Sequence, residues 1–251
     1  MRNKNVKTDK NSQKKVIISS FSNPYIVNYT EEAIISLKKV RNIGLKKFSL
    51  TGNITSLKQN SQISFESSLE RDYIYLLEFD TTVDEYFEQP LKIFYEVEGK
   101  KRYYVPDFYV KYCTNKRDAI IEIKYTYSLK KDKKKLEDKF KAARVFCQSN
   151  DIDFKILTEE DIRNELLFNS KFLLSYRNPK SVINYEDVEL LEELIKSSQT
   201  KTPSFIINTL DTDIEHRAQL LYTLWYMIAN DLAQTEINSK LTMSSKIWIN
   251  E

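Results

Sequence analysis

Two acidic residues and a lysine occur where neighbouring strands could bring them together. Asp107 follows Pro106, and Glu122 and Lys124 lie in a short segment that is otherwise apolar. Because side chains alternate between the two faces of a strand, Glu122 and Lys124 would point the same way, about 7 Å apart. Carboxylate oxygens bind hard cations such as Mg²⁺, and a nearby lysine can stabilise charge on a phosphate. The spacing is typical of a magnesium-dependent nuclease site.

Three strands are predicted around these residues, and they cover residues 91–97, 102–110 and 118–124. The Glu98-Gly99-Lys100 turn predicts that the first two form a hairpin. Pro106 cannot donate a hydrogen bond within a sheet, so it marks an edge or a bulge, where a side chain such as Asp107 is redirected. The alternative is a solvated sheet face that carries an ordinary Glu–Lys pair.

A third carboxylate, that of Glu70, lies on a helix predicted over residues 65–79. Glu70 is in line with Ile74 and Leu77 on that helix. It therefore lies at the edge of the buried stripe, where an unpaired charge is costly. For that reason we prefer Glu70 to Glu66 as the third acid of the site. The alternative is that both are exposed acids paired with lysines.

A run of lysines follows Lys124, on a segment whose apolar residues recur at helical spacing. Such a run usually forms a solvated helix face. Its position directly after the candidate site favours contact with a DNA backbone, because lysines neutralise phosphates. The predicted DNA-binding residues are Lys130, Lys131, Lys133 and Lys134.

The composition limits the chemistry that is available. Cys113, Cys147 and His216 are the only cysteines and histidine, too few for a usual zinc site. His216 lies in a helical run far from the cysteines, so a Cys–His nucleophilic pair and a histidine general base are nearly excluded. No apolar run is long enough to span a membrane, and the first residues lead into no signal-peptide core. We expect a cytoplasmic protein with reduced thiols.

Charge is unevenly distributed along the 251 residues. The net charge is +9 over residues 1–60, +1 over residues 61–150 and −7 over residues 151–251. The basic first segment suits phosphate contact, whereas the acidic last segment suits a protein partner. Solubility alone is the alternative explanation.

The chain has room for one medium domain and one small domain. Asn178-Pro179 interrupts the helical pattern, and we place the boundary near residue 169. Residues 1–168 would form the domain with the acidic site, with residues 1–15 mobile. Residues 169–251 would form a mostly helical domain, with helices over 185–196 and 213–233 and a closing strand near the end.

The order of these parts resembles the PD-(D/E)xK restriction-endonuclease-like fold. Five blocks in this order are similar to the amino-terminal domain of the TnsA family, the endonuclease subunits of heteromeric transposases. The blocks are Ser68-Leu69-Glu70-Arg71-Asp72, Leu76-Leu77-Glu78-Phe79-Asp80, Glu88-Gln89-Pro90-Leu91, Val105-Pro106-Asp107-Phe108 and Ile121-Glu122-Ile123-Lys124. The resemblance covers roughly residues 60–165 and is weaker over the remainder.

The resemblance implies an α/β fold, with a restriction-endonuclease-like mixed sheet flanked by helices and a small winged-helix-like carboxy-terminal domain. It also implies that Glu70, Asp107 and Glu122 hold Mg²⁺, with Mn²⁺ as a substitute, and that Lys124 is the catalytic lysine. The carbonyl of Ile123 would complete the metal site. Some family members have Gln at the position of Glu122, and here the acid follows the general nuclease pattern. Gln89 lies in a family-like block without an evident chemical role.

The family cuts DNA at the 5′ ends of a transposon during cut-and-paste transposition. The implied partners are transposon-end DNA, a transposase subunit resembling TnsB and an AAA+ ATPase resembling TnsC. The implied location is the bacterial cytoplasm, where the protein would associate with the nucleoid when it acts on DNA. One alternative is a stand-alone restriction or repair nuclease of the same fold. Another is a non-catalytic DNA-binding or scaffold protein.

Overall fold

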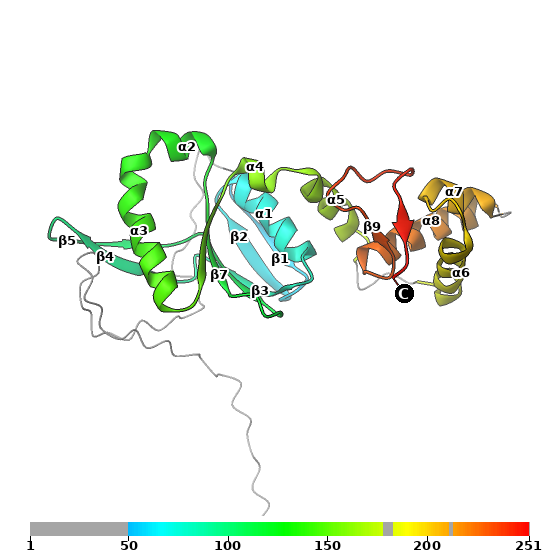
Figure 1. The fold of residues 1–251 in the computed structure, drawn as a ribbon, viewed down its shortest axis with the longest axis horizontal. Helices are drawn as coiled ribbons and strands as arrows, with labels where there is room; N and C mark the ends of the chain where they lie inside the picture. The colour runs from blue at the N-terminus through cyan, green and yellow to red at the C-terminus, as the bar shows by residue number, and fades with distance from the viewer. Residues whose placement is uncertain (1–49, 178–182, 211–212, 251) are drawn as a thin grey trace, which may run out of the picture. The chain divides into compact units, whose positions relative to one another are not determined.

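The computed structural model describes residues 50–177, 183–210 and 213–250, so the predicted mobile segment 1–15 lies outside the described residues. The chain forms two compact units, which Figure 1 shows as a ribbon. Of the described residues, the first unit contains 50–70 and 82–158, and the second contains 71–81, 159–177, 183–210 and 213–250. The units divide after Thr158, whereas the predicted boundary near residue 169 falls inside helix α5 (Glu165–Leu174).

The first unit is built on a four-stranded mixed sheet with the strand order β3-β6-β7-β8. Strand β3 (Val83–Glu88) is antiparallel to β6 (Phe108–Tyr112), and β6 is antiparallel to β7 (Ala119–Ile123). Strand β8 (Asp153–Leu157) runs parallel to β7. Parallel strands need a crossover, and helix α3 (Lys133–Ser149) supplies it between β7 and β8. Strand β7 lies in the interior of the sheet, and all five of its residues are buried.

The predicted strand over residues 102–110 is in fact two strands that belong to different sheets. Strand β5 (Lys100–Tyr104) pairs with β4 (Ile93–Val97) in a separate two-stranded sheet, and β6 begins at Phe108. Pro106 has no backbone N–H to donate to a sheet, and it lies between the two strands. The predicted hairpin turn is present, with positive φ at Glu98 (51°) and Gly99 (72°).

Two helices follow β7. The short helix α2 (Thr126–Lys131) precedes α3, which packs against β4, β5 and β8. The apolar side of α3 closes a core under the sheet. The core residues are Leu91, Ile93, Tyr104, Tyr109, Ile120, Ala142, Ala143, Phe146, Cys147 and Ile152.

A further hairpin begins the described part of the first unit. Strand β1 (Gly52–Ser56) pairs with β2 (Ser61–Phe65), and Gly52 lies opposite Phe65. A Cβ atom at position 52 would lie 2.7 Å from Cζ of Phe65, closer than carbon atoms pack. A larger residue at position 52 would therefore require the Phe65 ring to shift. Helix α1 (Ser68–Phe79) follows this hairpin and passes from the first unit into the second.

The second unit is mostly helical. Its further helices are α4 (Glu159–Ile162), α5, α6 (Tyr185–Ser197), α7 (Pro203–Thr209) and α8 (Ile214–Ala229). Side-chain caps explain where several begin, because Asn184, Thr202 and Asp213 each accept a backbone N–H bond from the first turn. The predicted helix over 213–233 ends at Ala229, and Asn230 follows it as the C-cap.

A small two-stranded sheet completes the second unit. Strands β9 (Gln234–Thr235) and β10 (Ile247–Trp248) are antiparallel and two residues long. Leu191, Ile206, Leu224 and Ile247 are among the residues of one apolar core that joins this pair to α6, α7 and α8. Helices with a small strand pair agree with a mostly helical unit, but they do not confirm the winged-helix prediction.

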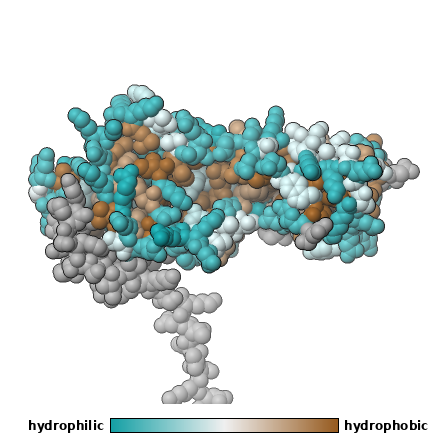
Figure 2. All heavy atoms as spheres, viewed as in Figure 1, coloured by the Kyte–Doolittle hydropathy of each residue, from teal (hydrophilic) through white to brown (hydrophobic). Residues whose placement is uncertain are grey.

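No helix in residues 50–177, 183–210 and 213–250 is long and apolar enough to cross a membrane. Hydrophilic residues cover much of the face shown in Figure 2, in keeping with a mean hydropathy of −0.51.

Candidate active site

Glu122 is a carboxylate in the interior of a sheet. It lies on β7, between β6 and β8, and only 1% of its surface is exposed. A buried charge is costly unless donors surround it. Oε1 accepts hydrogen bonds from Lys124 (2.9 Å) and Lys139 (2.8 Å), and Oε2 accepts one from the Tyr104 hydroxyl (2.5 Å). The sequence-based alternative of a solvated sheet face therefore does not apply to Glu122.

Asp107 reaches the end of β7 from the segment between β5 and β6. Its Oδ2 accepts a hydrogen bond from the backbone N–H of Ile123 at 2.7 Å and a longer contact from Nζ of Lys124 at 3.4 Å. The register in which Phe108 pairs with Ile121 places Asp107 level with the last residues of β7. Pro106 lies in the break between β5 and β6, which belong to different sheets, and not at the edge or bulge of one strand that the sequence predicted.

Lys124 joins the two carboxylates. Its Nζ contacts Oε1 of Glu122, the carbonyl oxygen of Ile123 (2.9 Å) and, at longer range, Oδ2 of Asp107. Burial lowers the pKa of Lys124, but the charges of Asp107 and Glu122 outweigh burial and raise that pKa above its usual range. Lys124 is therefore a cation at neutral pH.

The two carboxylates respond differently to this environment. Burial, together with the charges of Glu122 and Glu70, raises the pKa of Asp107 to about 7 against the opposing effect of Lys124. Burial also opposes ionisation of Glu122, but Lys124 and Lys139 outweigh it and lower the Glu122 pKa. Like-charged carboxylates in a buried cluster have this effect on one another, and such perturbation is typical of functional sites.

Glu70 belongs to this cluster through charge and not through direct contact. Its carboxylate accepts hydrogen bonds from the Glu66 backbone N–H (2.8 Å) and the Ser67 hydroxyl (2.9 Å) at the start of α1. The Ser67 hydroxyl also accepts from the Glu70 N–H, which is part of a helix capping box. Burial raises the pKa of Glu70, and the nearby charge of Lys124 lowers it. The structure thus brings Asp107, Glu122 and Lys124 into contact and leaves Glu70 at the edge of the group.

The donor set fits a hard divalent cation. In the part of the chain that the structure describes, no three His, Cys, Asp or Glu side chains are grouped as a ready set of metal ligands. Instead, Lys124 lies against the oxygens predicted to bind the cation, those of Asp107, Glu122 and Ile123. Carboxylate and carbonyl oxygens are the ligands that a hard divalent cation takes. Burial and the charge of Glu122 outweigh Lys124 and raise the Asp107 pKa.

Sequence reasoning missed Tyr104 and Lys139. Lys139 was one of many lysines on a helix, and Tyr104 was one aromatic residue in a strand. Their signal lies in the tertiary arrangement, since α3 packs on β5 and brings both to Glu122. Spacing to Leu136 and Phe140 on the apolar side of α3 could have marked Lys139 as a lysine at the edge of the buried face.

Gln89 also proves to be part of this neighbourhood. Its backbone N–H donates to the Asp107 carbonyl (2.9 Å), and its amide nitrogen donates to Glu66 (3.0 Å). Its φ is 46°, an unusual value for a residue other than glycine. The side-chain oxygen of Gln89 is buried without a hydrogen-bond partner among the described residues. Gln89 therefore links the segment before α1 to the backbone of Asp107.

The four lysines predicted to bind DNA lie apart from these contacts. Lys130 and Lys131 end α2, Lys133 and Lys134 begin α3, and all four are exposed. Their exposure is compatible with phosphate contact, and their DNA-binding role remains a prediction.

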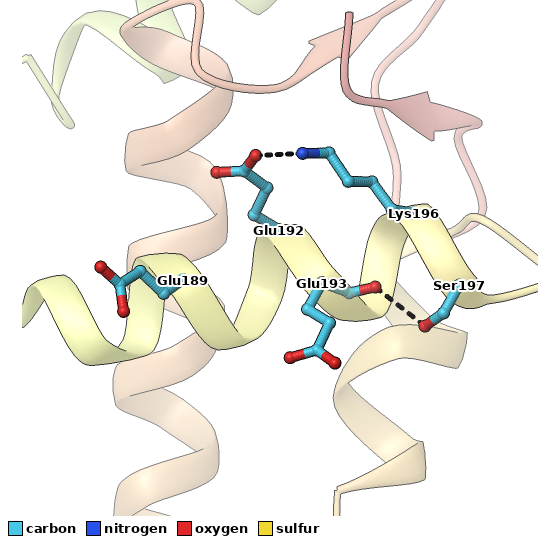
Figure 3. Close-up of a pocket in the computed structure, with 5 residues that line it drawn as sticks. All are labelled: Glu189, Glu192, Glu193, Lys196 and Ser197. Atoms are coloured by element: carbon cyan, nitrogen blue, oxygen red, sulfur yellow. Dashed lines mark hydrogen bonds and ion pairs between the residues drawn. The ribbon is translucent and has the colours of Figure 1, made fainter. Parts of the chain in front are cut away.

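A shallow pocket in the second unit has a different character (Figure 3). Its volume is about 590 Å³, and helix α6 alone supplies its lining: Glu189, Glu192, Glu193, Lys196 and Ser197. Lys196 is already paired with Glu192, and the Ser197 hydroxyl donates to the Glu193 backbone. These are ordinary one-turn contacts on a solvated helix, so the pocket offers no comparable cluster of buried groups.

A comparison with protein-family models gives a match that includes most of the candidate site. Residues 80–159 match the family model described as the TnsA-like endonuclease N terminal domain. The matched segment contains Asp107, Glu122 and Lys124, whereas Glu70 lies before it. No curated protein matched the chain. The mixed sheet flanked by helices is consistent with a restriction-endonuclease-like fold, and the match over residues 80–159 supports a TnsA-like endonuclease domain in this part of the chain.

Proposed function

We propose that this chain is the DNA-cleaving subunit of a heteromeric transposase, which cuts the 5′ ends of a transposon in cut-and-paste transposition. The contact of Lys124 with both Asp107 and Glu122, inside the region that matches the TnsA-like family, carries the proposal. The reaction is hydrolysis of a DNA phosphodiester, leaving a 5′ phosphate and a 3′ hydroxyl.

Asp107, Glu122 and the carbonyl of Ile123 would hold Mg²⁺, with Mn²⁺ as a substitute and Glu70 as an outer ligand. When bound, the metal ion would lower the pKa of water and stabilise the oxygens that carry charge during hydrolysis. Lys124 is cationic, lies beside both carboxylates and is 29% exposed. It can therefore orient a water molecule or stabilise the charged phosphate.

The remainder of the chain has supporting roles in this proposal. Lys130, Lys131, Lys133 and Lys134 would contact the DNA backbone. The acidic carboxy-terminal residues would bind protein partners, namely a transposase subunit resembling TnsB and an AAA+ ATPase resembling TnsC. Recognition of particular transposon ends would depend on the transposase partner.

A nicking assay tests the proposal. Labelled transposon-end DNA is incubated with Mg²⁺ and the full-length chain, with and without a candidate transposase that resembles TnsB. We expect nicks at the 5′ ends that require the metal. Asp107→Ala should bind DNA and partners but leave the DNA intact. Asp84→Ala is the matched control, because Asp84 is a 54% exposed aspartate of the same unit, and it should nick like the wild type.

Each outcome has a definite meaning. Nicking by Asp107→Ala in Mg²⁺ would contradict the site assignment. Cleavage of any DNA by the wild type without a transposase would favour a stand-alone restriction or repair nuclease. Absence of metal-dependent cleavage in every mixture would favour a non-catalytic DNA-binding or scaffold protein.

A further inference from the structure

Glu122 accepts hydrogen bonds from two residues, Lys139 and Tyr104, that have no role in the proposed reaction. Lys124 and Lys139 both donate to Oε1, and the Tyr104 hydroxyl donates to Oε2. The three donors come from three segments, since Tyr104 ends β5, Lys124 directly follows β7 and Lys139 lies in the middle of α3. Both oxygens of a nearly inaccessible carboxylate are therefore held from more than one direction.

Tyr104 and Lys139 are themselves fixed by packing. Tyr104 is 4% exposed and belongs to the core between α3 and the strands. Nζ of Lys139 lies 4.8 Å from the centre of the Tyr104 ring and 5.1 Å from that of Phe140, within the range of cation–π contact. Burial, together with the Glu122 charge, raises the Tyr104 pKa well above its ordinary value. The phenol therefore stays protonated and donates a hydrogen bond to Glu122.

Lys124 and Lys139 differ in what else they contact. Lys124 also contacts Asp107 and the carbonyl of Ile123, so its charge is shared among the groups of the candidate site. Within the described residues, Lys139 forms an ion pair with Glu122 alone. If Lys124 turns toward a DNA phosphate, Glu122 loses one donor, but Lys139 and Tyr104 still engage both of its oxygens.

We propose that Lys139 and Tyr104 act as positioning residues, which hold the Glu122 carboxylate in place so that Lys124 is free to serve the reacting phosphate. This inference rests on the proposed function in assigning that role to Lys124. It assigns to α3 a part in the site that is separate from DNA contact. Hydrogen-bond partners that orient metal-binding side chains typically contribute about 10- to 100-fold to metal affinity or activity.

The first test does not depend on activity. Native-state hydrogen exchange of the β7 backbone amides measures how often the central strand opens. Lys139→Met should increase β7 exchange in the wild-type background, because it removes a donor from a buried charge. In a Glu122→Gln background the same substitution should have a clearly smaller effect, since a neutral amide needs no countercharge. Equal effects in both backgrounds, measured as a double-mutant cycle, would overturn the inference.

The second test is nicking by the full-length chain with its transposase partner. Lys139→Met and Tyr104→Phe should each reduce nicking about 10- to 100-fold and raise the Mg²⁺ concentration needed for half-maximal nicking. Lys139→Arg, which keeps the charge, should recover a measurable part of the loss. The matched control is Lys135→Met, because Lys135 is an exposed lysine one turn earlier on α3.

The results separate positioning from general stability. A protein that is merely less stable keeps its normal Mg²⁺ requirement in the folded fraction, so an unchanged requirement in Lys139→Met would overturn the positioning role. Equal loss in Lys135→Met would overturn it as well, since the effect would then reflect charge on α3. If the wild type does not nick at all, the proposed function fails, whereas the exchange cycle still decides whether Lys139 supports Glu122.

Discussion

Asp72 in the second unit and Glu122 in the first are both buried carboxylates surrounded by cations. Asp72 is 4% exposed and pairs with Arg71 (3.0 Å), Arg163 (2.9 Å) and Lys171 (2.7 Å). Burial raises the Asp72 pKa, but Lys171, Arg71 and Arg163 outweigh burial and lower it. Three cations thus surround one acid.

The Glu122 cluster has a different ratio of acids to cations. Of its two lysines, Lys124 contacts Asp107 as well as Glu122. Burial and the neighbouring acidic charges raise the Asp107 pKa to about 7. Buried acids in ion pairs are common structural devices, whereas paired acids with opposed pKa shifts are typical of sites that bind a cation or transfer protons. The ratio of acids to cations, and not burial alone, therefore distinguishes the candidate active site, with two carboxylates for two lysines, from the Asp72 cluster, with one carboxylate for three cations.

The largest expected difference between the two clusters is in catalysis. Asp107→Asn keeps the shape of the side chain but removes the charge, so nicking should fall about 1000-fold or more, which corresponds to about 4 kcal/mol of transition-state stabilisation. Asp72→Asn should keep nearly full nicking per folded molecule. The measurement is the initial rate of nicking at a temperature where both variants are folded. Comparable losses in both variants would remove the distinction.

Stability should show the opposite order. Asp72→Asn removes the carboxylate charge that pairs with Arg71, Arg163 and Lys171. We therefore expect the free energy of unfolding to fall by about 2 kcal/mol. Both tryptophans, Trp225 and Trp248, lie in the second unit, so urea unfolding followed by tryptophan fluorescence reports on the unit that contains Asp72. Asp107→Asn should leave that transition unchanged. An unchanged midpoint in Asp72→Asn would show that the three ion pairs contribute nothing.

The pH dependence of that stability has a definite sign. The folded-state pKa of Asp72 is lowered, so its stabilisation is fully present above the unfolded-state pKa, which is about 3.9. It is lost as the pH falls through the folded-state pKa. The difference in unfolding free energy between wild type and Asp72→Asn should therefore be constant from about pH 5 to 7 and shrink below about pH 4. A difference that grows on acidification would contradict the role of the ion pairs.

The smallest expected effects are those of exposed lysines. Substituting Lys133 and Lys134 with Gln should weaken DNA binding several-fold and reduce the slope of the salt dependence by about one unit for each phosphate that is no longer neutralised. The check is DNA affinity across a series of salt concentrations. Lys155→Gln is the control, because Lys155 is half-exposed on β8, outside the predicted DNA-binding set. An unchanged salt slope in the double variant would show that these lysines only solvate the helix.

The sequence predicted much of the first unit because local rules decided it. Strand β7 and the hairpin of β4 and β5 follow from alternation and turn residues. Strand β3 and the separation of β5 from β6 were not predicted, since which sheet a strand joins depends on contacts distant in the sequence. The same limit applies to Lys139 and Tyr104, whose role arises only when α3 packs on β5.

Glu70 shows a different limit. The helix predicted over residues 65–79 begins at Ser68, which puts Glu70 in its first turn. There the Glu70 carboxylate accepts hydrogen bonds from Glu66 and Ser67 and caps α1. A capping acid and a site acid have the same sequence signature, Ser-x-x-Glu ahead of an apolar run. Periodicity could therefore identify the position of Glu70 and could not distinguish its two uses.

Locating a bound cation by NMR would test the proposed metal site without relying on cleavage. Mn²⁺ broadens the signals of nuclei close to it, so substoichiometric Mn²⁺ added to the isotopically labelled chain reports where the ion binds. We expect selective broadening of the backbone amides of Asp107, Ile123 and Lys124, none around Asp72, and loss of the effect in Asp107→Asn. Broadening centred on Asp72, or broadening at Ile123 that persists in Asp107→Asn, would show that Asp107 and its neighbours do not form the metal site.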